Sequence, residues 1–245
     1  MSVQEIETEA DAQKRYHPPP GFVEQKPFYT PFLIGALVVV SVAQLAVGLE
    51  MSVDIAAINR PLFLAGDYWR LFTSSVTHAG LIHLAFNSFA LLSFGRIQEQ
   101  MAPRESVPLV VLFASIGGGL LSIAWNPDSA SVGASGGIIG LLGYMTAYAL
   151  IRRKLMSERF LYQLFGNIVF VLVLGIFVIP NVDNAGHIGG LLTGAAVAWF
   201  EVPRNLEVDP RKPGSVFRMI GIASFGITLL SAALTAIAFL YLGLG

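Results

Sequence analysis

The chain has 245 residues, of which 54% are hydrophobic and only 13% are charged. A soluble domain usually carries about 25% charged residues, so this composition indicates a membrane protein. The net charge of −1 argues against a nucleic-acid partner, and the absence of cysteine excludes a disulfide framework.

The first 31 residues are polar, carry charges of both signs and include three consecutive prolines. They lack the apolar run near the start that marks a secretory signal. We therefore predict three segments. Residues 1–31 form a disordered cytosolic tail, residues 32–202 form the membrane-embedded core, and residues 203–245 form a linker and a final helix.

Seven stretches without Asp, Glu, Lys or Arg follow the tail. Each is near the ~20 residues that a helix needs to cross ~30 Å of hydrocarbon. The stretches cover residues 27–49, 71–95, 106–127, 129–151, 160–182, 184–200 and 219–245. The predicted fold class is all-α, a polytopic membrane helix bundle. The second stretch opens with polar residues, so its helix is expected to begin near Leu81, and residues 58–65 are expected to lie in the membrane interface.

The distribution of Lys and Arg predicts the orientation of these spans. If the tail is inside, inside segments hold 13 basic residues and outside segments hold 2, Arg60 and Arg70, which together make all 15. We therefore expect a multi-pass protein of the plasma (inner) membrane, with a cytosolic amino terminus and an external carboxyl terminus.

Four polar residues are predicted to converge at one depth. The second, fourth and sixth spans run in the same direction, so their first turns lie at a similar level near the outer face. His83 and Asn87 lie in the opening turns of the second span, Ser135 opens the fourth and His187 opens the sixth. Polar groups inside membrane spans are costly unless they are paired or used.

Glycines on the fourth and sixth spans predict close helix packing, because small residues let helix backbones approach in lipid. These are Gly133, Gly136, Gly137, Gly140 and Gly143 on the fourth span, and Gly186, Gly190 and Gly194 on the sixth. Tight structural packing alone would explain the glycines. Together with Ser135 and His187, the packing is interpreted as the means of setting a hydrogen-bond distance.

The four polar residues favour serine-protease chemistry. A serine becomes a nucleophile when a base accepts its proton, and His187 can be that base for Ser135. The backbone N–H of Ser135 lies at a helix amino terminus and can donate to an oxyanion, as can His83 and Asn87, which share one helix face. The alternative for His83 and Asn87 is a purely structural role in hydrogen bonds between helices.

No Asp or Glu lies inside any of the seven stretches, so the spans are expected to lack carboxylates. Asp183 is four residues before His187 but is expected to face water. The sequence therefore predicts a Ser–His dyad rather than a triad. The lack of charged groups within the stretches also weakens a transporter or channel interpretation, since ion relays use such groups.

Residues from about Tyr68 to Phe200 resemble the rhomboid family of intramembrane serine proteases. The resemblance rests on Trp69-Arg70, on the segment from His78 to Asn87, on Gly95 and Glu99, on Gly133-Ala134-Ser135-Gly136 and on the segment from Ala185 to Gly190. The short glycine motifs are weak singly, but their order across three spans of one direction is specific.

The resemblance implies a six-helix catalytic core with one additional carboxyl-terminal helix. It implies Ser135 as nucleophile, His187 as base, and His83, Asn87 and the Ser135 backbone as the oxyanion hole, with no metal or cofactor. Transmembrane proteins in the lipid bilayer would be the substrates, cut near their outer ends. Trp69 and Arg70 would organise the first outside loop, and the fifth span would be the lateral gate through which substrates enter.

One position departs from the family pattern. Many members carry an aromatic residue one turn after the serine, where it stacks on the histidine, and here that residue is Ile139. Packing on His187 is then expected from an aliphatic side chain or from another aromatic residue such as Tyr144. The main alternative function is a catalytically inactive rhomboid-like protein that binds membrane helices and controls their trafficking or turnover.

Overall fold

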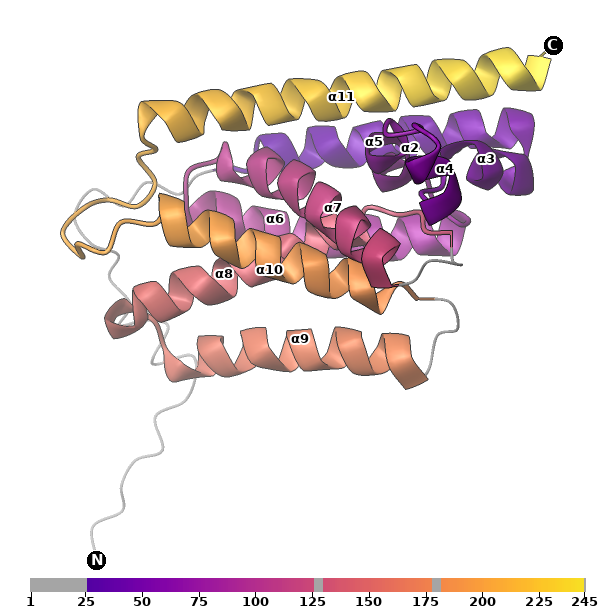
Figure 1. The fold of residues 1–245 in the computed structure, drawn as a ribbon. Helices are drawn as coiled ribbons and strands as arrows, with labels where there is room; N and C mark the ends of the chain where they lie inside the picture. The colour runs from indigo at the N-terminus through magenta and orange to yellow at the C-terminus, as the bar shows by residue number, and fades with distance from the viewer. Residues whose placement is uncertain (1–25, 126–129, 178–181, 245) are drawn as a thin grey trace, which may run out of the picture.

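The computed structural model describes residues 26–125, 130–177 and 182–244, which are helical and contain no β-strand. Most of the predicted tail lies outside these residues. The long helices are α2 (Tyr29–Val47), α6 (Leu81–Met101), α7 (Ser106–Trp125), α8 (Ser135–Ile151), α9 (Glu158–Phe177), α10 (Asn184–Glu201) and α11 (Ser215–Leu244). They fall on the seven predicted stretches, which confirms a polytopic helical bundle, and α6 begins at Leu81 as predicted (Figure 1).

The helices differ in how well they suit a membrane by themselves. Within the described residues, α2, α7, α9 and α11 are long and apolar enough to cross a bilayer. The bent pair of α5 (Arg70–Val76) and α6, which meet at 91°, makes a fifth candidate. The 17-residue α8 is shorter, and α8 and α10 lie between α9 and the layer formed by α2 and α11 (Figure 1). Neighbouring helices therefore cover the two helices on which the site depends.

The expectation that the spans lack carboxylates is wrong for α6. This helix continues beyond its charge-free stretch and contains Glu99, which is fully buried. The carboxylate accepts hydrogen bonds from the backbone N–H groups of Phe28, Tyr29 and Thr30 and from the Thr30 hydroxyl. These N–H groups have no partner within α2, whose first turn they begin, so Glu99 both satisfies that helix end and is itself satisfied.

Arg152 joins the ends of α8 and α10. It directly follows α8, is 2% exposed, and donates hydrogen bonds of 3.0–3.3 Å to four carbonyl groups in the segment after α10. These carbonyls belong to Pro203, Asn205, Leu206 and Val208. A guanidinium group has five N–H donors in a planar arrangement, which suits several carbonyl acceptors at once. The ends of α8 and α10 far from Ser135 and His187 are thus held together.

The helices α9 and α11 pack very differently. Leu164 is the buried residue of α9 within the part of the chain that is described, and α9 lies at the edge of the bundle (Figure 1). In contrast, α11 lies along α2 and α7 and buries Ala232, Ala236 and Phe239. Moving α9 away from the bundle would therefore expose little additional apolar surface. In contrast, α11 is an integral part of the bundle.

The segment between α2 and α6 contains more structure than predicted. It folds into α3 (Leu49–Ala56), α4 (Arg60–Leu64) and α5, and only the region of α4 was expected. Trp69 and Arg70 belong to this segment, and the Arg70 guanidinium lies 4.7 Å from the centre of the Trp69 ring. The charge-free criterion missed α5 because it placed this polar helix and α6 in one stretch.

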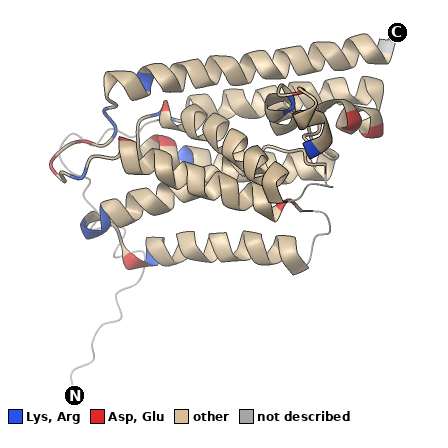
Figure 2. Ribbon diagram, in the orientation of Figure 1, with Lys and Arg blue, Asp and Glu red and all other residues tan. Residues whose placement is uncertain are grey.

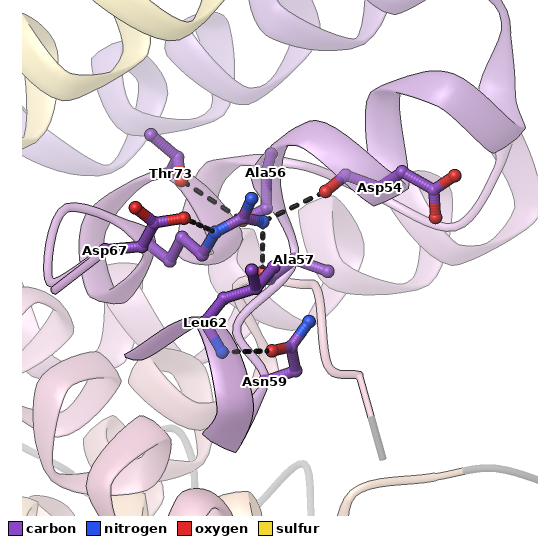
Figure 3. A network of polar contacts seen from close by, with 8 residues as sticks. Asp54, Ala56, Ala57, Asn59, Leu62, Asp67 and Thr73 are labelled. Carbon is purple, nitrogen blue, oxygen red and sulfur yellow. Dashed lines mark hydrogen bonds and ion pairs between the residues drawn. The ribbon is translucent and has the colours of Figure 1, made fainter. Parts of the chain in front are cut away.

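Arg70 holds this segment together. The residue is 7% exposed, and its guanidinium group donates to the carbonyl groups of Asp54 and Ala57 and to the Asp67 carboxylate, at 2.8–3.0 Å. Thr73 adds a hydrogen bond to the Ala56 carbonyl (Figure 3). Three parts of the segment that are distant in sequence are therefore tied to one side chain.

Lys and Arg residues gather at the end of the bundle where α8 continues into the short helix η1 (Arg153–Leu155) (Figure 2). The opposite end carries α3, α4 and α5 (Figure 1). Ser135 and His187 lie in the first turns of α8 and α10, which begin at this opposite end. The predicted orientation remains a prediction, and it would place the two residues near the outer face.

Candidate active site

Ser135 and His187 meet. Ser135 is the first residue of α8 and His187 is the fourth residue of α10. The Nε2 atom of His187 lies 3.0 Å from the Oγ atom of Ser135, which is hydrogen-bond distance. His187 is 7% exposed, so the pair is largely removed from bulk solvent. The structure thus brings together the two residues that the sequence singled out first.

A sharp turn delivers Ser135 to this position. Gly133 has a φ of +129°, which side-chain-bearing residues rarely adopt, and its N–H donates to the Ser74 carbonyl at 2.8 Å. The chain then enters α8, so the Ser135 N–H has no acceptor within the helix. A backbone donor and the Ser135 hydroxyl are therefore available at the same residue.

Glycines set the separation of α8 and α10. A Cβ atom on Gly190 would lie 2.1 Å from the Gly136 carbonyl oxygen, and one on Gly194 would lie 1.9 Å from the Gly140 carbonyl oxygen. Real side chains do not fit at such distances, so the two backbones are in direct contact. The face of α8 that carries Gly136 and Gly140 therefore packs, as predicted, on the face of α10 that carries Gly190 and Gly194.

The helix α7 completes this packing, which sequence reasoning missed. A Cβ atom on Gly118 would lie 2.6 Å from the Gly186 carbonyl oxygen, and one on Gly189 would lie 2.6 Å from the Gly117 carbonyl oxygen. The consecutive glycines 117–119 in the third stretch were the available signal. The position of His187 on α10 is therefore fixed by backbone contacts with both α7 and α8, and not with α8 alone.

Asp183 caps α10. Its side chain accepts a hydrogen bond from the Gly186 N–H at 2.8 Å, and its backbone carbonyl accepts one from the His187 N–H at 3.0 Å. The Nδ1 atom of His187 is buried and has no hydrogen-bond partner among the described residues. The carboxylate nearest in sequence to His187 therefore stabilises the helix start and makes no hydrogen bond with the imidazole ring.

His83 is held in a defined tautomer. Its Nδ1 atom accepts a hydrogen bond of 3.3 Å from the Ala79 backbone N–H. A neutral imidazole carries its proton on the other nitrogen in that case, so Nε2 is a donor. A Cβ atom on Gly133 would lie 2.9 Å from that nitrogen, which places the donor against the turn that leads to Ser135.

Asn87 approaches the same turn. Its Nδ2 atom would lie 3.5 Å from a Cβ atom on Gly133, and the side chain is 6% exposed. This amide nitrogen has no hydrogen-bond partner within the described parts of the chain. His83 and Asn87 therefore present two side-chain donors beside Gly133, two residues before Ser135.

A small cavity adjoins the Ser135–His187 pair. It has about 30 Å³ of room for water. Its lining is mostly glycine and serine and consists of Ile58, Ser74, Ser75, Ser115, Gly118, Gly119, Ser131, Val132, Gly133, Ser135, Gly136, Asp183, Gly186 and His187. His83 and Asn87 do not line it and contact Gly133 from α6 instead. The cavity, from here on the catalytic cavity, can admit water and small side chains to the Ser135 hydroxyl.

A two-bond backbone contact anchors the segment before Ser135. The Ile58 N–H donates to the Ser131 carbonyl at 3.0 Å and the Ser131 N–H donates to the Ile58 carbonyl at 2.9 Å. Ile58 follows Ala57, whose carbonyl is bound by Arg70. Sequence reasoning missed this contact, which links the Arg70 network to the turn at Ser135.

The suggestion that Tyr144 packs on His187 is wrong. The Tyr144 hydroxyl donates to the Glu201 carboxylate at 2.9 Å. Glu201 is 14 residues beyond His187 on α10, or about 21 Å along the helix. Ile139, which takes the position of the family's aromatic residue, is 7% exposed.

Comparisons with known proteins show the family of the chain. A family model described as Rhomboid domain matches residues 65–204. Rhomboid protease GluP of Bacillus subtilis (strain 168) is 37% identical over 202 residues, which are 80% of this chain and 36% of GluP. RHOMBOID-like protein 6, mitochondrial, of Arabidopsis thaliana is 39% identical over 152 residues, 62% of this chain and 48% of that protein. Rhomboid protease AarA of Providencia stuartii is 31% identical over 176 residues, 60% of this chain and 61% of AarA.

The matched regions cover less than two thirds of each of these relatives. Within this chain, the family model nevertheless includes Arg70, the four polar residues and the glycines of α7, α8 and α10. The chain therefore belongs to the rhomboid family and is an integral, multi-pass membrane protein.

Proposed function

We propose that the protein is a serine endopeptidase that hydrolyses peptide bonds in or near the transmembrane segments of other membrane proteins. The observation that carries this proposal is the 3.0 Å separation of the Ser135 hydroxyl and His187 Nε2. A catalytically inactive relative would not need this pair at hydrogen-bond distance. Names of relatives that include "rhomboid protease" support the same activity.

The first half of the reaction forms an acyl-enzyme. His187 Nε2 accepts the Ser135 proton as Oγ attacks the peptide carbonyl, and it then gives this proton to the leaving amine. The developing oxyanion accepts hydrogen bonds from the Ser135 N–H, His83 Nε2–H and Asn87 Nδ2–H. Losing one such donor typically costs about 10²–10³ in rate, so these three groups would supply much of the catalysis.

The second half hydrolyses the acyl-enzyme. Water attacks the ester carbonyl while His187 takes a water proton, and the bond to Ser135 Oγ breaks as that oxygen regains a proton from His187. The catalytic cavity provides space for this water beside Ser135.

Substrates would reach the site sideways from the bilayer. Since α9 buries little of its surface, it can separate from the bundle at low cost, which supports its assignment as the lateral gate. A helix hides its peptide carbonyls in its own hydrogen bonds, so the substrate must unwind before cleavage. We therefore propose cleavage near the outer end of the substrate helix, where water can satisfy the freed backbone.

Small residues are expected immediately before the cleaved bond. The catalytic cavity has about 30 Å³ of room and a wall of glycines and serines, which leaves no space for a large side chain. The test is a set of transmembrane peptides in proteoliposomes that differ only at this position, with products identified by mass spectrometry. Alanine and glycine should be cut faster than leucine or phenylalanine, and a preference for phenylalanine would contradict the assignment of this cavity.

Replacing Asp183 by asparagine should leave most of the activity. Asparagine caps a helix about as well as aspartate, so the position of His187 should be kept. In a Ser–His–Asp triad the same change lowers kcat by about 10⁴-fold. Steady-state cleavage rates of the Asp183→Asn variant therefore distinguish a dyad from a triad, and a loss of that size would show that Asp183 acts on His187.

A further inference from the structure

A second cavity lies behind the site, and α11 forms part of its wall. It has about 20 Å³ of room for water and is lined by residues of α2, α5, α6, α7 and α11 and by Ala134. The residues that α11 contributes are Thr228 and Ser231. We call this space the inner cavity. Because its remaining wall is largely apolar, its few hydroxyl groups determine what it can hold.

The inner cavity adjoins the catalytic cavity. Ser75 of α5 and Ser115 of α7 line both spaces. Ala134 lines the inner cavity, and the next residue, Ser135, lines the catalytic cavity. The segment Ala134–Ser135 thus separates the two cavities. The side chains of Ser75 and Ser115 lie where the cavities adjoin.

The hydroxyl groups of the inner cavity suit water. The Ser231 Oγ atom is shielded from solvent and has no hydrogen-bond partner in the described chain. The Thr228 and Ser75 hydroxyls donate to carbonyl groups of their own helices at 2.9 and 2.7 Å, which leaves their oxygen lone pairs free to accept. A buried water needs two to four polar partners and about 10–15 Å³ of room. The inner cavity meets both requirements.

We propose that α11 helps to hold water in the inner cavity, and that this water supplies the hydrolysis of the acyl-enzyme on Ser135. The inference rests on the proposed peptidase function. One water molecule is consumed per turnover: its oxygen bonds to the acyl carbon, one proton passes through His187 to Ser135 Oγ, and the peptide leaves as a carboxylic acid. The seventh helix is then a functional part of the enzyme and does more than anchor the chain.

The test measures deacylation by itself. Full-length protein in detergent is acylated with 4-nitrophenyl butyrate, and the decay of the butyryl adduct on Ser135 is followed by intact mass. Ser231→Val removes the unpartnered hydroxyl and fills the space with methyl groups, so the decay should slow about tenfold. Thr228→Val keeps the side-chain shape, removes a second water ligand and should slow the decay to a smaller degree. Formation of the adduct should proceed at the wild-type rate in both variants.

Thr235→Val is the matched control. Thr235 is also a buried threonine of α11 whose hydroxyl donates to the carbonyl group four residues earlier, but it does not line the inner cavity. Its variant should deacylate at the wild-type rate.

Equal slowing in all three variants, or wild-type decay in Ser231→Val, would overturn the inference. If Ser231→Val does not fold, wild-type decay in Thr228→Val would have the same meaning. Failure of the wild-type protein to form any adduct on Ser135 would instead refute the peptidase function, and the inference with it.

Discussion

Replacing Ser135 by alanine is expected to abolish cleavage while the protein remains folded. Loss of the nucleophile from a serine hydrolase lowers kcat by about 10⁶-fold. The change removes one oxygen atom and one hydrogen bond to His187, which typically contributes about 1 kcal/mol to stability. Cleavage of a transmembrane substrate in proteoliposomes and thermal unfolding in detergent measure the two effects separately.

Asn87→Ala provides a graded comparison for Ser135→Ala. Two oxyanion donors would remain, so cleavage should fall by about 10²–10³-fold and stay detectable. A Ser135→Ala protein that cuts substrate at the wild-type rate would show that another group is the nucleophile. Equal, complete loss in both variants together with a large fall in melting temperature would show that the substitutions act through folding.

Replacing Gly194 by alanine is expected to lower the proposed peptidase activity from a distance. Gly194 is seven residues beyond His187, or about two helical turns, and does not line the catalytic cavity. The added Cβ atom would lie 1.9 Å from the Gly140 carbonyl oxygen, 2.6 Å from its carbonyl carbon and 2.8 Å from its Cα atom. These are backbone atoms, so relief requires α8 and α10 to move apart. A shift of about 1 Å at the dyad can cost about 10²-fold in rate, and the overpacking should cost about 1–3 kcal/mol of stability.

Gly226→Ala is the matched control for Gly194→Ala. Gly226 lies within α11, and a Cβ atom there would have no neighbour within 4 Å. Alanine in a helix interior is more favourable than glycine, so this variant should keep full activity and an unchanged or slightly higher melting temperature. Wild-type activity in Gly194→Ala would mean that direct backbone contact between α8 and α10 does not set the dyad distance.

The sequence predicted the long helices well because each one overlaps a stretch without charged residues, although α6 continues beyond its own stretch. Ser135 and His187 could be paired from the sequence since their spans run in one direction and carry glycines at four-residue spacing. Both signals are local and periodic, and membrane helices have few alternative ways to satisfy them.

Features that depend on single, long-range contacts could not be predicted in this way. No periodic sequence pattern accompanies the two backbone hydrogen bonds between Ile58 and Ser131. The same is true of the hydrogen bonds from Arg152 to the carbonyl groups around it. Glu99 lies beyond the charge-free stretch of residues 71–95, so the criterion used for the spans did not include it. Its burial depends on donors at the start of α2, 69–71 positions away.

Reaction with a fluorophosphonate, followed by intact-mass mapping of the modified residue, tests the central claim most directly. An activated serine attacks this probe without needing a substrate helix or a hydrolytic water. We expect one adduct per chain, located on Ser135, and no adduct in folded Ser135→Ala or His187→Ala protein. A folded wild-type protein that does not react, or that reacts equally well without His187, would contradict the claim that these two residues form a catalytic dyad.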